Sequence, residues 1–240
     1  MIFAAGLGTR LGDYTKDRPK ALVEVSGYAL LDAQIRKMYS FGIRKIVVNV
    51  HHFAAQIIEF LDHYPKKDIK FLVSDESDLL LDTGGGLKKA ASLFTNNTPV
   101  LLHNVDILSD LDFNILEKEF HGDCMLMLKD RQSSRKLLFD SDMNLCGWRN
   151  NQSGEQIDVI GAKKEAYELS YSGIALMKSD FALNLPGEGV FQIIPALLKA
   201  AEQYEIKGSV LPHKWIDVGK IHELDDAEKH MNDYFKKWLI

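Results

Sequence analysis

The sequence of 240 residues lacks the patterns that mark several classes of protein. Its two cysteines, Cys124 and Cys146, form neither a CxxC spacing nor a zinc pattern, so we expect two free, buried thiols. The apolar runs are too short for a membrane helix, and no signal-peptide pattern opens the chain. The formal net charge of −5 argues against a general nucleic-acid or membrane-surface binder. We therefore expect a cytoplasmic protein whose partners are neither nucleic acids nor membranes.

The first half of the chain alternates between strand-like and helix-like patterns. Strands are predicted at residues 2–5, 45–50, 69–73 and 100–102, and helices at 30–41, 53–61, 87–94 and 113–120. Asp112 is the predicted N-cap of the last of these helices. Such alternation indicates parallel strands joined by right-handed crossovers, with helices on both faces of the sheet.

The second half is less regular. Strands are predicted at 125–128, at 169–177 and near Val210, with a hairpin over 137–148, and helices at 191–204 and 222–238. Neither an internal repeat nor a low-complexity linker is present, so a single domain with an insertion in its second half is expected. The last helix has an apolar face that packs internally or against a partner, which leaves the oligomeric state open; the residues of this face are Leu224, Met231, Phe235 and Trp238.

A glycine-rich loop follows the first strand. Gly6, Gly8 and Gly12 allow the backbone to approach a ligand and leave its N–H groups free for phosphate oxygens, although a structural turn fits equally well. The P-loop pattern is absent, and the dinucleotide fingerprint fails because Leu11 stands at its third glycine. The strand that ends near residue 50 also carries Asn49 where a ribose-binding acid would be expected.

Two basic residues flank this loop. Arg10 follows the glycines directly, and Lys20 follows Pro19, whose ring fixes the local backbone. A triphosphate needs positive charge along its length, which favours a phosphate-binding role for this pair over a solvated basic loop.

Two acids lie among apolar residues. Asp106 comes just after a buried strand, where ligands of open α/β sheets gather, and Asp217 lies between Ile216 and Val218. Mg²⁺ prefers one or two carboxylates together with waters and phosphates, while a buried salt bridge or a helix cap is the alternative for either acid. The segment 82–86 (DTGGG) precedes a predicted helix and could bind an anion or a nucleotide base there. The alternative is a flexible turn without a ligand.

Taken in order, these segments resemble the sugar-1-phosphate nucleotidyltransferase family, most of all its N-acetylmuramate-1-phosphate uridylyltransferase and mannose-1-phosphate guanylyltransferase types. The matching motifs are Gly6-Leu7-Gly8-Thr9-Arg10, Pro19-Lys20, Asp82–Gly86, Asn104–Asp106, Ser172-Gly173 and Trp215–Gly219. Val105 replaces the glycine of the family's Asn-Gly-Asp motif, Ala21 replaces a common proline, and the Glu-Lys-Pro motif of the sugar side is absent. The hexapeptide repeats of the bifunctional acetyltransferase branch are also absent.

The resemblance implies an α/β fold: a Rossmann-like, mostly parallel but mixed sheet flanked by helices, with a small β-rich insertion on the sugar side. It implies a single nucleotidyltransferase domain over residues 1–240, with a nucleotide-binding half at 1–120 and a sugar-binding half with the C-terminal helix at 121–240.

The implied reaction joins a nucleoside triphosphate to a sugar 1-phosphate and releases pyrophosphate, with uridylyl or guanylyl transfer favoured. Mg²⁺ is the implied cofactor, held by Asp106 and Asp217, and the implied catalytic residues are Arg10, Lys20 and Asp106. Sugar contacts are implied for Asn104, Ser172 and Gly173. Nucleotide contacts are implied for Ala5, Gly6, Gly8, Thr9, Thr83, Gly84 and Gly85.

The chemistry needs no general base, because a phosphate monoester with a second pKa near about 6 is already largely ionised at neutral pH. Two alternatives remain at this stage. One is an NAD(P)-dependent oxidoreductase on a Rossmann-like fold, which the missing fingerprint acid disfavours. The other is a non-catalytic sensor of sugar nucleotides, which would need less of the metal-binding apparatus.

Overall fold

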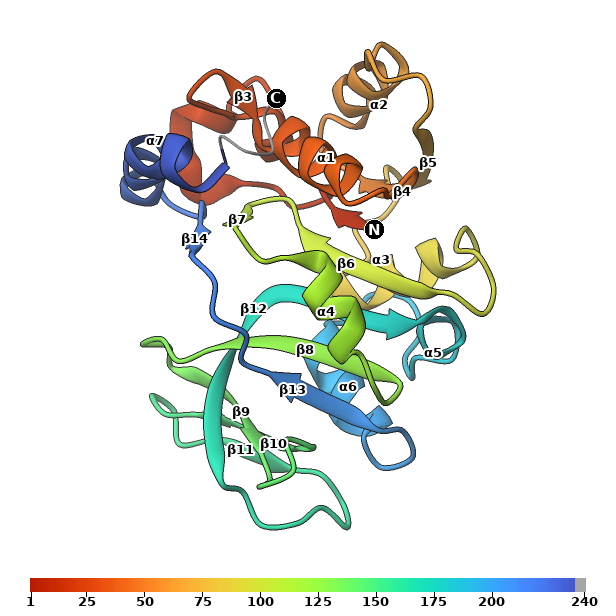
Figure 1. Ribbon diagram of the computed structural model, residues 1–240, viewed down its shortest axis with the longest axis vertical. Helices are drawn as coiled ribbons and strands as arrows, with labels where there is room; N and C mark the ends of the chain where they lie inside the picture. The colour runs from red at the N-terminus through yellow and green to blue at the C-terminus, as the bar shows by residue number, and fades with distance from the viewer. Residues whose placement is uncertain (236–240) are drawn as a thin grey trace. The chain divides into compact units, whose positions relative to one another are not determined.

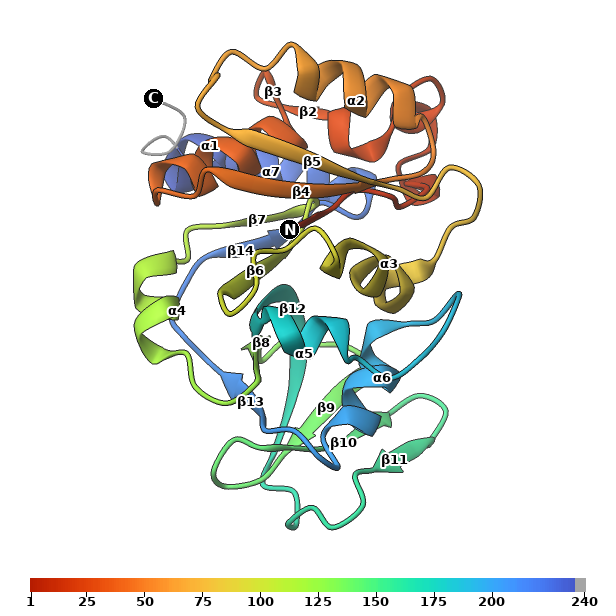
Figure 2. The same ribbon diagram turned by 90° about the vertical axis from the view of Figure 1, so that its right-hand side faces the viewer.

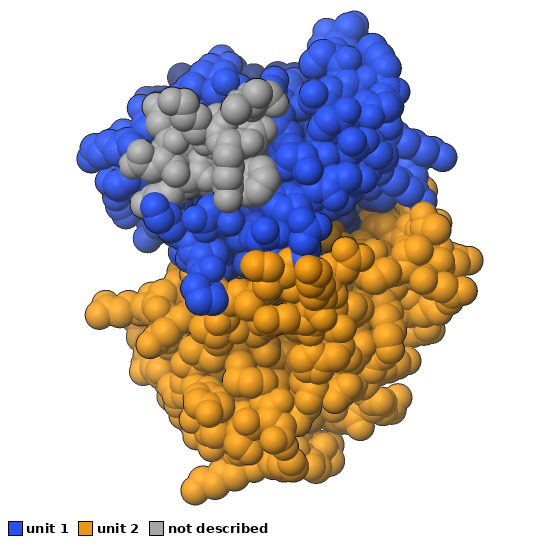
Figure 3. All heavy atoms as spheres, viewed as in Figure 1, with its two compact units in different colours: residues 1–80, 103–114, 212–240 blue, residues 81–102, 115–211 orange. Residues whose placement is uncertain are grey.

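The computed structural model describes residues 1–235 and the side chains of residues 1–230 (Figure 1). The chain forms two compact units, coloured separately in Figure 3. Unit 1 contains residues 1–80 and 103–114 and the chain from residue 212 onward, and unit 2 contains residues 81–102 and 115–211. Each unit therefore combines segments that are far apart in the sequence.

Unit 1 is built on parallel strands (Figure 2). Strand β1 (Ile2–Phe3) lies between β4 (Lys45–Val50) and the end of β6 (Pro99–Asn104), and β5 (Lys70–Asp75) pairs with β4. Helices α1 (Leu30–Ser40) and α2 (Ala54–Asp62) follow β1 and β4 along the chain. The β-branched run of β4 is buried from Ile46 to Val50, which suits a strand with neighbours on both sides.

Short elements complete unit 1 and lie around the ends of these strands. They are the 3₁₀ helices η1 (Thr9–Thr15) and η2 (Lys20–Leu22), the antiparallel pair β2 (Glu24–Val25) and β3 (Tyr28–Ala29), and the antiparallel pair β7 (Ile107–Ser109) and β14 (Trp215–Asp217). Helix α7 (Ile221–Phe235) follows β14. These segments are too short to show a period, so the sequence predicted none of the strands among them.

Unit 2 is a mixed sheet with helices. Strand β8 (Cys124–Lys129) pairs antiparallel with β12 (Tyr167–Lys178) and parallel with β13 (Ile206–Ser209). The antiparallel strands β9 (Arg135–Phe139), β10 (Leu145–Asn150) and β11 (Gln156–Asp158) extend from β12. The helices are α3 (Asp82–Ala91), α5 (Ser179–Leu183) and α6 (Ile193–Ala200); α4 (Phe113–Glu119) begins in unit 1 and ends in unit 2.

The expected α/β class is confirmed, with parallel pairing in unit 1 and mixed pairing in unit 2. The capping role of Asp112 is also confirmed, because its side chain accepts the N–H of Asn114 at 2.9 Å. The short strand predicted near Val210 is present as β13, although its paired residues end at Ser209 and leave Val210 outside it. The predicted end of the last helix at Trp238, and its apolar residues Met231 and Phe235, lie outside the described side chains.

Both cysteines are free and buried, as expected. Burial raises the pKa of the Cys146 thiol to about 11, so this thiol stays protonated at neutral pH. Within residues 1–235, no helix has the length and apolar character that a membrane span requires.

A buried polar contact ties together the strand ends of unit 1. The side chain of Asn49, at the end of β4, accepts the N–H of Ala4 at 2.8 Å and donates to the Glu76 carboxylate at 2.7 Å. Asn49 is 3% exposed and Glu76 is 1% exposed, so water does not replace these bonds easily. Asn49 thus anchors the backbone just where the glycine loop leaves β1.

We expect Asn49→Ala to lower the free energy of unfolding by about 2–3 kcal/mol, because it removes one bond to a buried N–H and one to a buried carboxylate. Urea denaturation followed by circular dichroism would measure the change. Asn96→Ala, at an exposed position of unit 2, is the matched control and should stay within about 0.5 kcal/mol of the wild type. Equal stability of the two variants would contradict an anchoring role for Asn49.

Candidate functional site

The glycine loop after β1 folds back over Lys20. Gly8 has φ 68°, in the left-handed region, and a Cβ at this position would lie 2.9 Å from the Cβ of Lys20. The hydroxyl of Thr15 closes the loop by donating to the carbonyls of Gly8 and Gly12 at 3.1 and 3.2 Å. Glycine at position 8 is therefore required both by the backbone angle and by the close approach of Lys20.

Lys20 opens η2 directly after Pro19, and its ammonium group meets Asp106 of the same unit. The Nζ–Oδ2 distance is 2.5 Å, and the two side chains are only 10% and 19% exposed. A charge-assisted hydrogen bond of this kind is stronger than a surface ion pair because little water competes for either group. Two residues that lie far apart in the sequence therefore form one charged unit.

Asp217 is brought beside Asp106 by strand pairing. In the β14–β7 pair Asp217 lies opposite Ile107, and the N–H of Val218 donates to the carbonyl of Asp106 at 2.8 Å. Burial raises the pKa of Asp217, and the negative charge of Asp106 raises it further, while Lys20 and Arg10 act in the opposite direction. Helix α7 begins only at Ile221, so the alternative of Asp217 as its N-cap does not hold.

Three charged side chains of unit 1 converge on Gly219. A Cβ at this glycine would lie 2.9 Å from Oδ1 of Asp217, 3.1 Å from Nη2 of Arg10 and 3.3 Å from Oε2 of Glu223. The N–H of Gly219 also donates to the Glu223 carboxylate at 3.0 Å. Because Gly219 has no side chain, the Arg10 guanidinium can lie beside the carboxylate of Asp217.

Glu223 was not among the predicted site residues. It lies in the first turn of α7 and reaches back to the backbone ahead of the helix, as the acidic residue of a capping box does. Its position in the first turn of a predicted helix is the signal that could have identified it, although a capping role alone would not have placed it beside Arg10 and Asp217.

The donor set suits a divalent cation. Asp106 and Asp217 supply carboxylate oxygens. Burial raises the pKa of Asp217 and the charge of Asp106 raises it further, and a bound cation would offset both effects. The described side chains contain no group of three or more His, Cys, Asp or Glu residues that could hold a metal ion. A site with one or two carboxylates, completed by waters and phosphate oxygens, matches the preference of Mg²⁺ rather than that of Zn²⁺.

The glycine-rich segment 82–86 differs from the flexible turn considered above, because it forms the first turns of α3. The N–H groups of Gly84 and Gly85 donate to the carbonyl of Phe191 at 2.9 and 3.2 Å, and the Thr83 hydroxyl accepts the N–H of Ile193 at 3.0 Å. A Cβ at Gly84 would lie 2.4 Å from the Phe191 ring. These glycines allow α3 to pack against the 187–192 loop, and their contacts with a nucleotide stay a prediction.

Ser172 and Gly173 lie in an irregular part of β12, in unit 2. The pairing with β8 shifts between Tyr171 and Ala175, and Gly173 has φ 82°, so a bulge turns the strand at this pair. Asn104 ends β6 in unit 1, beside Phe3 of β1. Ala5 is buried, while Gly6 and Thr9 are exposed. The binding roles of these residues stay predictions.

His103 packs in the interior of the protein. Its side chain is fully buried, and burial, helped by the nearby charge of Lys37, lowers the pKa of His103 to about 3. The ring is therefore neutral at physiological pH and lies 6.1 Å from the Phe113 ring. A neutral, buried imidazole is a packing group rather than an acid or base near pH 7.

Comparison with known proteins shows similarity over most of the chain. Residues 1–116 match a family model described as a MobA-like NTP transferase domain. The chain is 31% identical over 232 residues to N-acetylmuramate alpha-1-phosphate uridylyltransferase from Caulobacter vibrioides, covering 91% of this chain and 90% of that protein. It is 26% identical to the protein of the same name from Neisseria meningitidis, covering 95% of this chain and 96% of that protein.

Other matches are partial or distant. The catalytic subunit beta of mannose-1-phosphate guanylyltransferase from Dictyostelium discoideum is 32% identical over 47% of this chain and 32% of its own length. The crystal structure of HddC from Yersinia pseudotuberculosis has a TM-score of 0.76 at 21% identity, covering 96% of this chain and 97% of that one. UDP-glucose pyrophosphorylase from Acinetobacter baumanii has a TM-score of 0.76 at 14% identity, covering 99% and 94%. At these identities the structures establish the fold.

We expect Gly8→Ala to destabilise unit 1 by about 1–3 kcal/mol, because alanine is strained at φ 68° and its Cβ would press on Lys20. Gly6→Ala in the same loop is the matched control, since Gly6 has no positive φ and its Cβ would meet nothing within 4 Å. Thermal and urea unfolding of the two variants would test the difference. Equal stability would mean that the loop does not hold Gly8 in this conformation.

Proposed function

The chain belongs to the sugar-1-phosphate nucleotidyltransferase family, and we propose that it transfers a uridylyl group from UTP to an N-acetylmuramate-type sugar 1-phosphate. The supporting observation is the gathering of Arg10, Lys20, Asp106 and Asp217 in unit 1, two cations and two acids that suit a metal-bound triphosphate. In this reaction an oxygen of the sugar phosphate forms a bond to the α-phosphorus. The bond from that phosphorus to the bridging oxygen breaks, and pyrophosphate leaves with its electron pair.

The choice of substrates is supported by the relatives that align over most of the chain. The Caulobacter uridylyltransferase aligns with 91% of the chain, whereas the Dictyostelium guanylyltransferase aligns with 47% of it. Guanylyl transfer is the second candidate for the same site. Residues 1–120 are proposed as the nucleotide-binding half and 121–240 as the sugar-binding half of one nucleotidyltransferase domain.

The cationic residues act on the phosphates in this proposal. Arg10 stabilises the pyrophosphate as negative charge builds up on it, and Lys20 stabilises the reacting phosphates. Lys20 is bonded to Asp106 in the structure, so its ammonium group is already held at the site before a triphosphate enters. The repulsion between two anionic substrates is the main barrier, and preorganised cations lower it without any rearrangement at the moment of reaction.

Asp106 and Asp217 are proposed to hold Mg²⁺. When bound there, Mg²⁺ would neutralise part of the negative charge of the phosphates. The backbone of Gly6, Gly8 and Thr9 would contact the nucleotide phosphates. Ala5, Thr83, Gly84 and Gly85 would contact the rest of the nucleotide, and Asn104, Ser172 and Gly173 the sugar.

The two alternative functions have no comparable support. The matches reported above include none that supports an NAD(P)-dependent oxidoreductase, and a non-catalytic sensor would not need two acids with a lysine bonded to one of them. A cytoplasmic location and a role in supplying cell-wall or polysaccharide precursors are part of the proposal.

The function can be tested by measuring pyrophosphate release with each of five nucleoside triphosphates and the 1-phosphates of N-acetylmuramate, mannose and glucose. We expect UTP with N-acetylmuramate 1-phosphate to give the highest kcat/KM. Release with GTP and mannose 1-phosphate alone would favour the guanylyl alternative. The absence of pyrophosphate with every pair would overturn the proposal.

Metal dependence gives a second test. Asp106→Asn should lower kcat by about 100-fold or more, because a ligand of the charge-neutralising ion is lost, while the far-ultraviolet circular dichroism stays unchanged. EDTA should inactivate the wild type, and excess Mg²⁺ should restore it. Asp225→Asn, an exposed acid of α7 in the same unit, is the matched control and should keep wild-type activity. Full activity of Asp106→Asn with Mg²⁺ present would exclude Asp106 as a metal ligand.

A further inference from the structure

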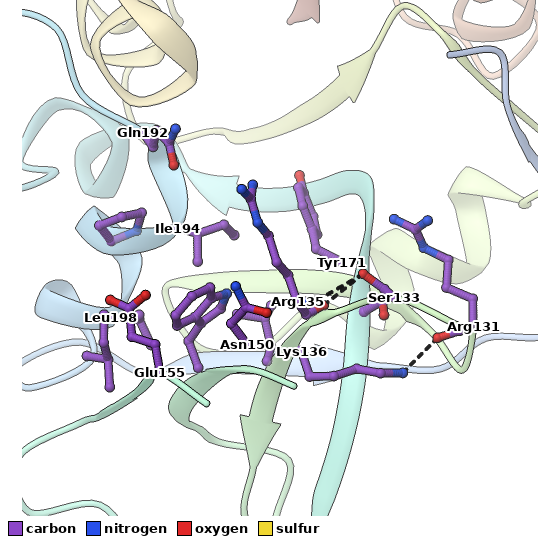
Figure 4. Close-up of a pocket in the computed structure, with 15 residues that line it drawn as sticks. Arg131, Ser133, Arg135, Lys136, Asn150, Glu155, Tyr171, Gln192, Ile194 and Leu198 are labelled. Carbon is purple, nitrogen blue, oxygen red and sulfur yellow. Dashed lines mark hydrogen bonds between the residues drawn. The ribbon is translucent and has the colours of Figure 1, made fainter. Parts of the chain in front are cut away.

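Unit 2 contains a pocket that the proposed roles above do not use. Its volume is about 390 Å³, within the range of small-molecule sites. Strands β9, β10 and β12 and helix α6 supply its walls, so the hairpin and the helix meet around it (Figure 4). Trp148, Ile194 and Leu198 form an apolar side suited to the flat, C–H-bearing face of a sugar ring.

The other side of the pocket is basic. Arg131, Arg135 and Lys136 line it, against a single acid, Glu155. Lys136 is already engaged, since its ammonium group donates to the carbonyl of Arg131 at 2.7 Å and lies 3.9 Å from Asp130. In the described part of the chain the guanidinium of Arg135 makes no ion pair, and in Figure 4 it points in the same direction as the ring of Tyr171. Arg135 is thus available to a negatively charged ligand.

A buried hydroxyl provides a second, independent sign of a ligand. Ser170 lines the pocket and is 2% exposed, yet its Oγ has no hydrogen-bond partner among the described residues. A buried hydroxyl without a partner costs free energy in the folded protein, so most are paired. A ligand with an acceptor oxygen beside Arg135 would supply the missing bond.

The pocket adjoins the segments to which sugar and nucleotide roles are assigned. Ser170 and Tyr171 directly precede Ser172 in β12, and both line the pocket. Gln192, at its rim, follows Phe191, whose carbonyl accepts the N–H groups of α3. All these residues belong to unit 2, so the pocket shares a strand and a loop with the sugar side of the proposed enzyme.

We propose that this pocket binds a carboxylate-bearing substituent of the sugar 1-phosphate, with Arg135 and Ser170 contacting the carboxylate and Trp148 the adjoining apolar atoms. The inference rests on the proposed function and adds the residues that would distinguish an acidic sugar from a neutral one. An arginine provides parallel donors that match the two carboxylate oxygens, whereas a neutral sugar leaves the basic side of the pocket without a counter-charge.

The discriminating substrates are N-acetylmuramate 1-phosphate and N-acetylglucosamine 1-phosphate, which differ only in the lactyl ether that carries the carboxylate. Steady-state kinetics of pyrophosphate release with UTP would give KM and kcat for each. We expect Arg135→Gln to lower the ratio of kcat/KM for the acidic over the neutral substrate about tenfold or more, mainly through KM. Arg135→Glu should lower this ratio further, because it places a like charge in the pocket.

Lys199→Gln is the matched control. It removes one positive charge from the exposed side of α6 without touching the pocket, so the ratio should stay at the wild-type value. Circular dichroism of Arg135→Gln should be unchanged, because Arg135 is exposed. If Arg135→Gln leaves the ratio unchanged, or lowers kcat/KM equally for both substrates, the pocket does not bind the carboxylate and the inference fails.

The failure of the proposed function would look different. In that case the wild type would release no pyrophosphate from any pair of substrates, and binding of the two sugar phosphates would be compared by calorimetry. Tighter binding of the acidic sugar that is lost in Arg135→Gln would still support the pocket. Equal binding of the two sugars, or no binding of either, would overturn it.

Discussion

The ion pair between Lys20 and Asp106 is the contact around which the charged site of unit 1 is arranged. It joins the end of the glycine loop to the turn after β6, and it places a positive charge against an acid that has a second acid for a neighbour. Burial disfavours the charged form of Asp217, and the negative charge of Asp106 adds to that cost. Lys20 and Arg10 act against that cost within the folded chain, so the same charges that stabilise the site are those that a triphosphate and a divalent ion would use.

Close backbone approaches make this clustering of charge feasible. At Gly8 the absence of a side chain lets the loop lie against Lys20, and at Gly219 it leaves space where Arg10, Asp217 and Glu223 converge. Gly85 has a comparable role in unit 2, where a Cβ would lie 2.3 Å from the carbonyl of Gly189. In each case another group occupies the place of the side chain, and at Gly8 the left-handed backbone angle requires glycine as well.

The charges in the pocket of unit 2 are distributed differently from those at the site of unit 1. Unit 1 balances acids with cations, whereas the pocket between the β9–β10 hairpin and α6 has more basic groups than acidic ones. An excess of positive charge beside a tryptophan favours a ligand with both an anionic group and an apolar face. Under the proposed function, nucleotide chemistry and sugar selectivity fall on separate residues, so that one could vary without disturbing the other.

The sequence by itself determined the α/β class, most of the long helices and strands, and the motifs that reveal the family, because periodicity and glycine or proline spacing are local properties. It also indicated Arg10, Lys20, Asp106 and Asp217, since charged residues at the ends of apolar runs stand out. Only the tertiary structure decided that Lys20 bonds Asp106, that Glu223 joins Arg10 at Gly219, and that residues 82–86 are helical. Each of these depends on contacts between segments tens of residues apart, for which no local pattern exists: the helix at Asp82 forms because Phe191 accepts its N–H groups, and the basic pocket forms because a hairpin meets α6.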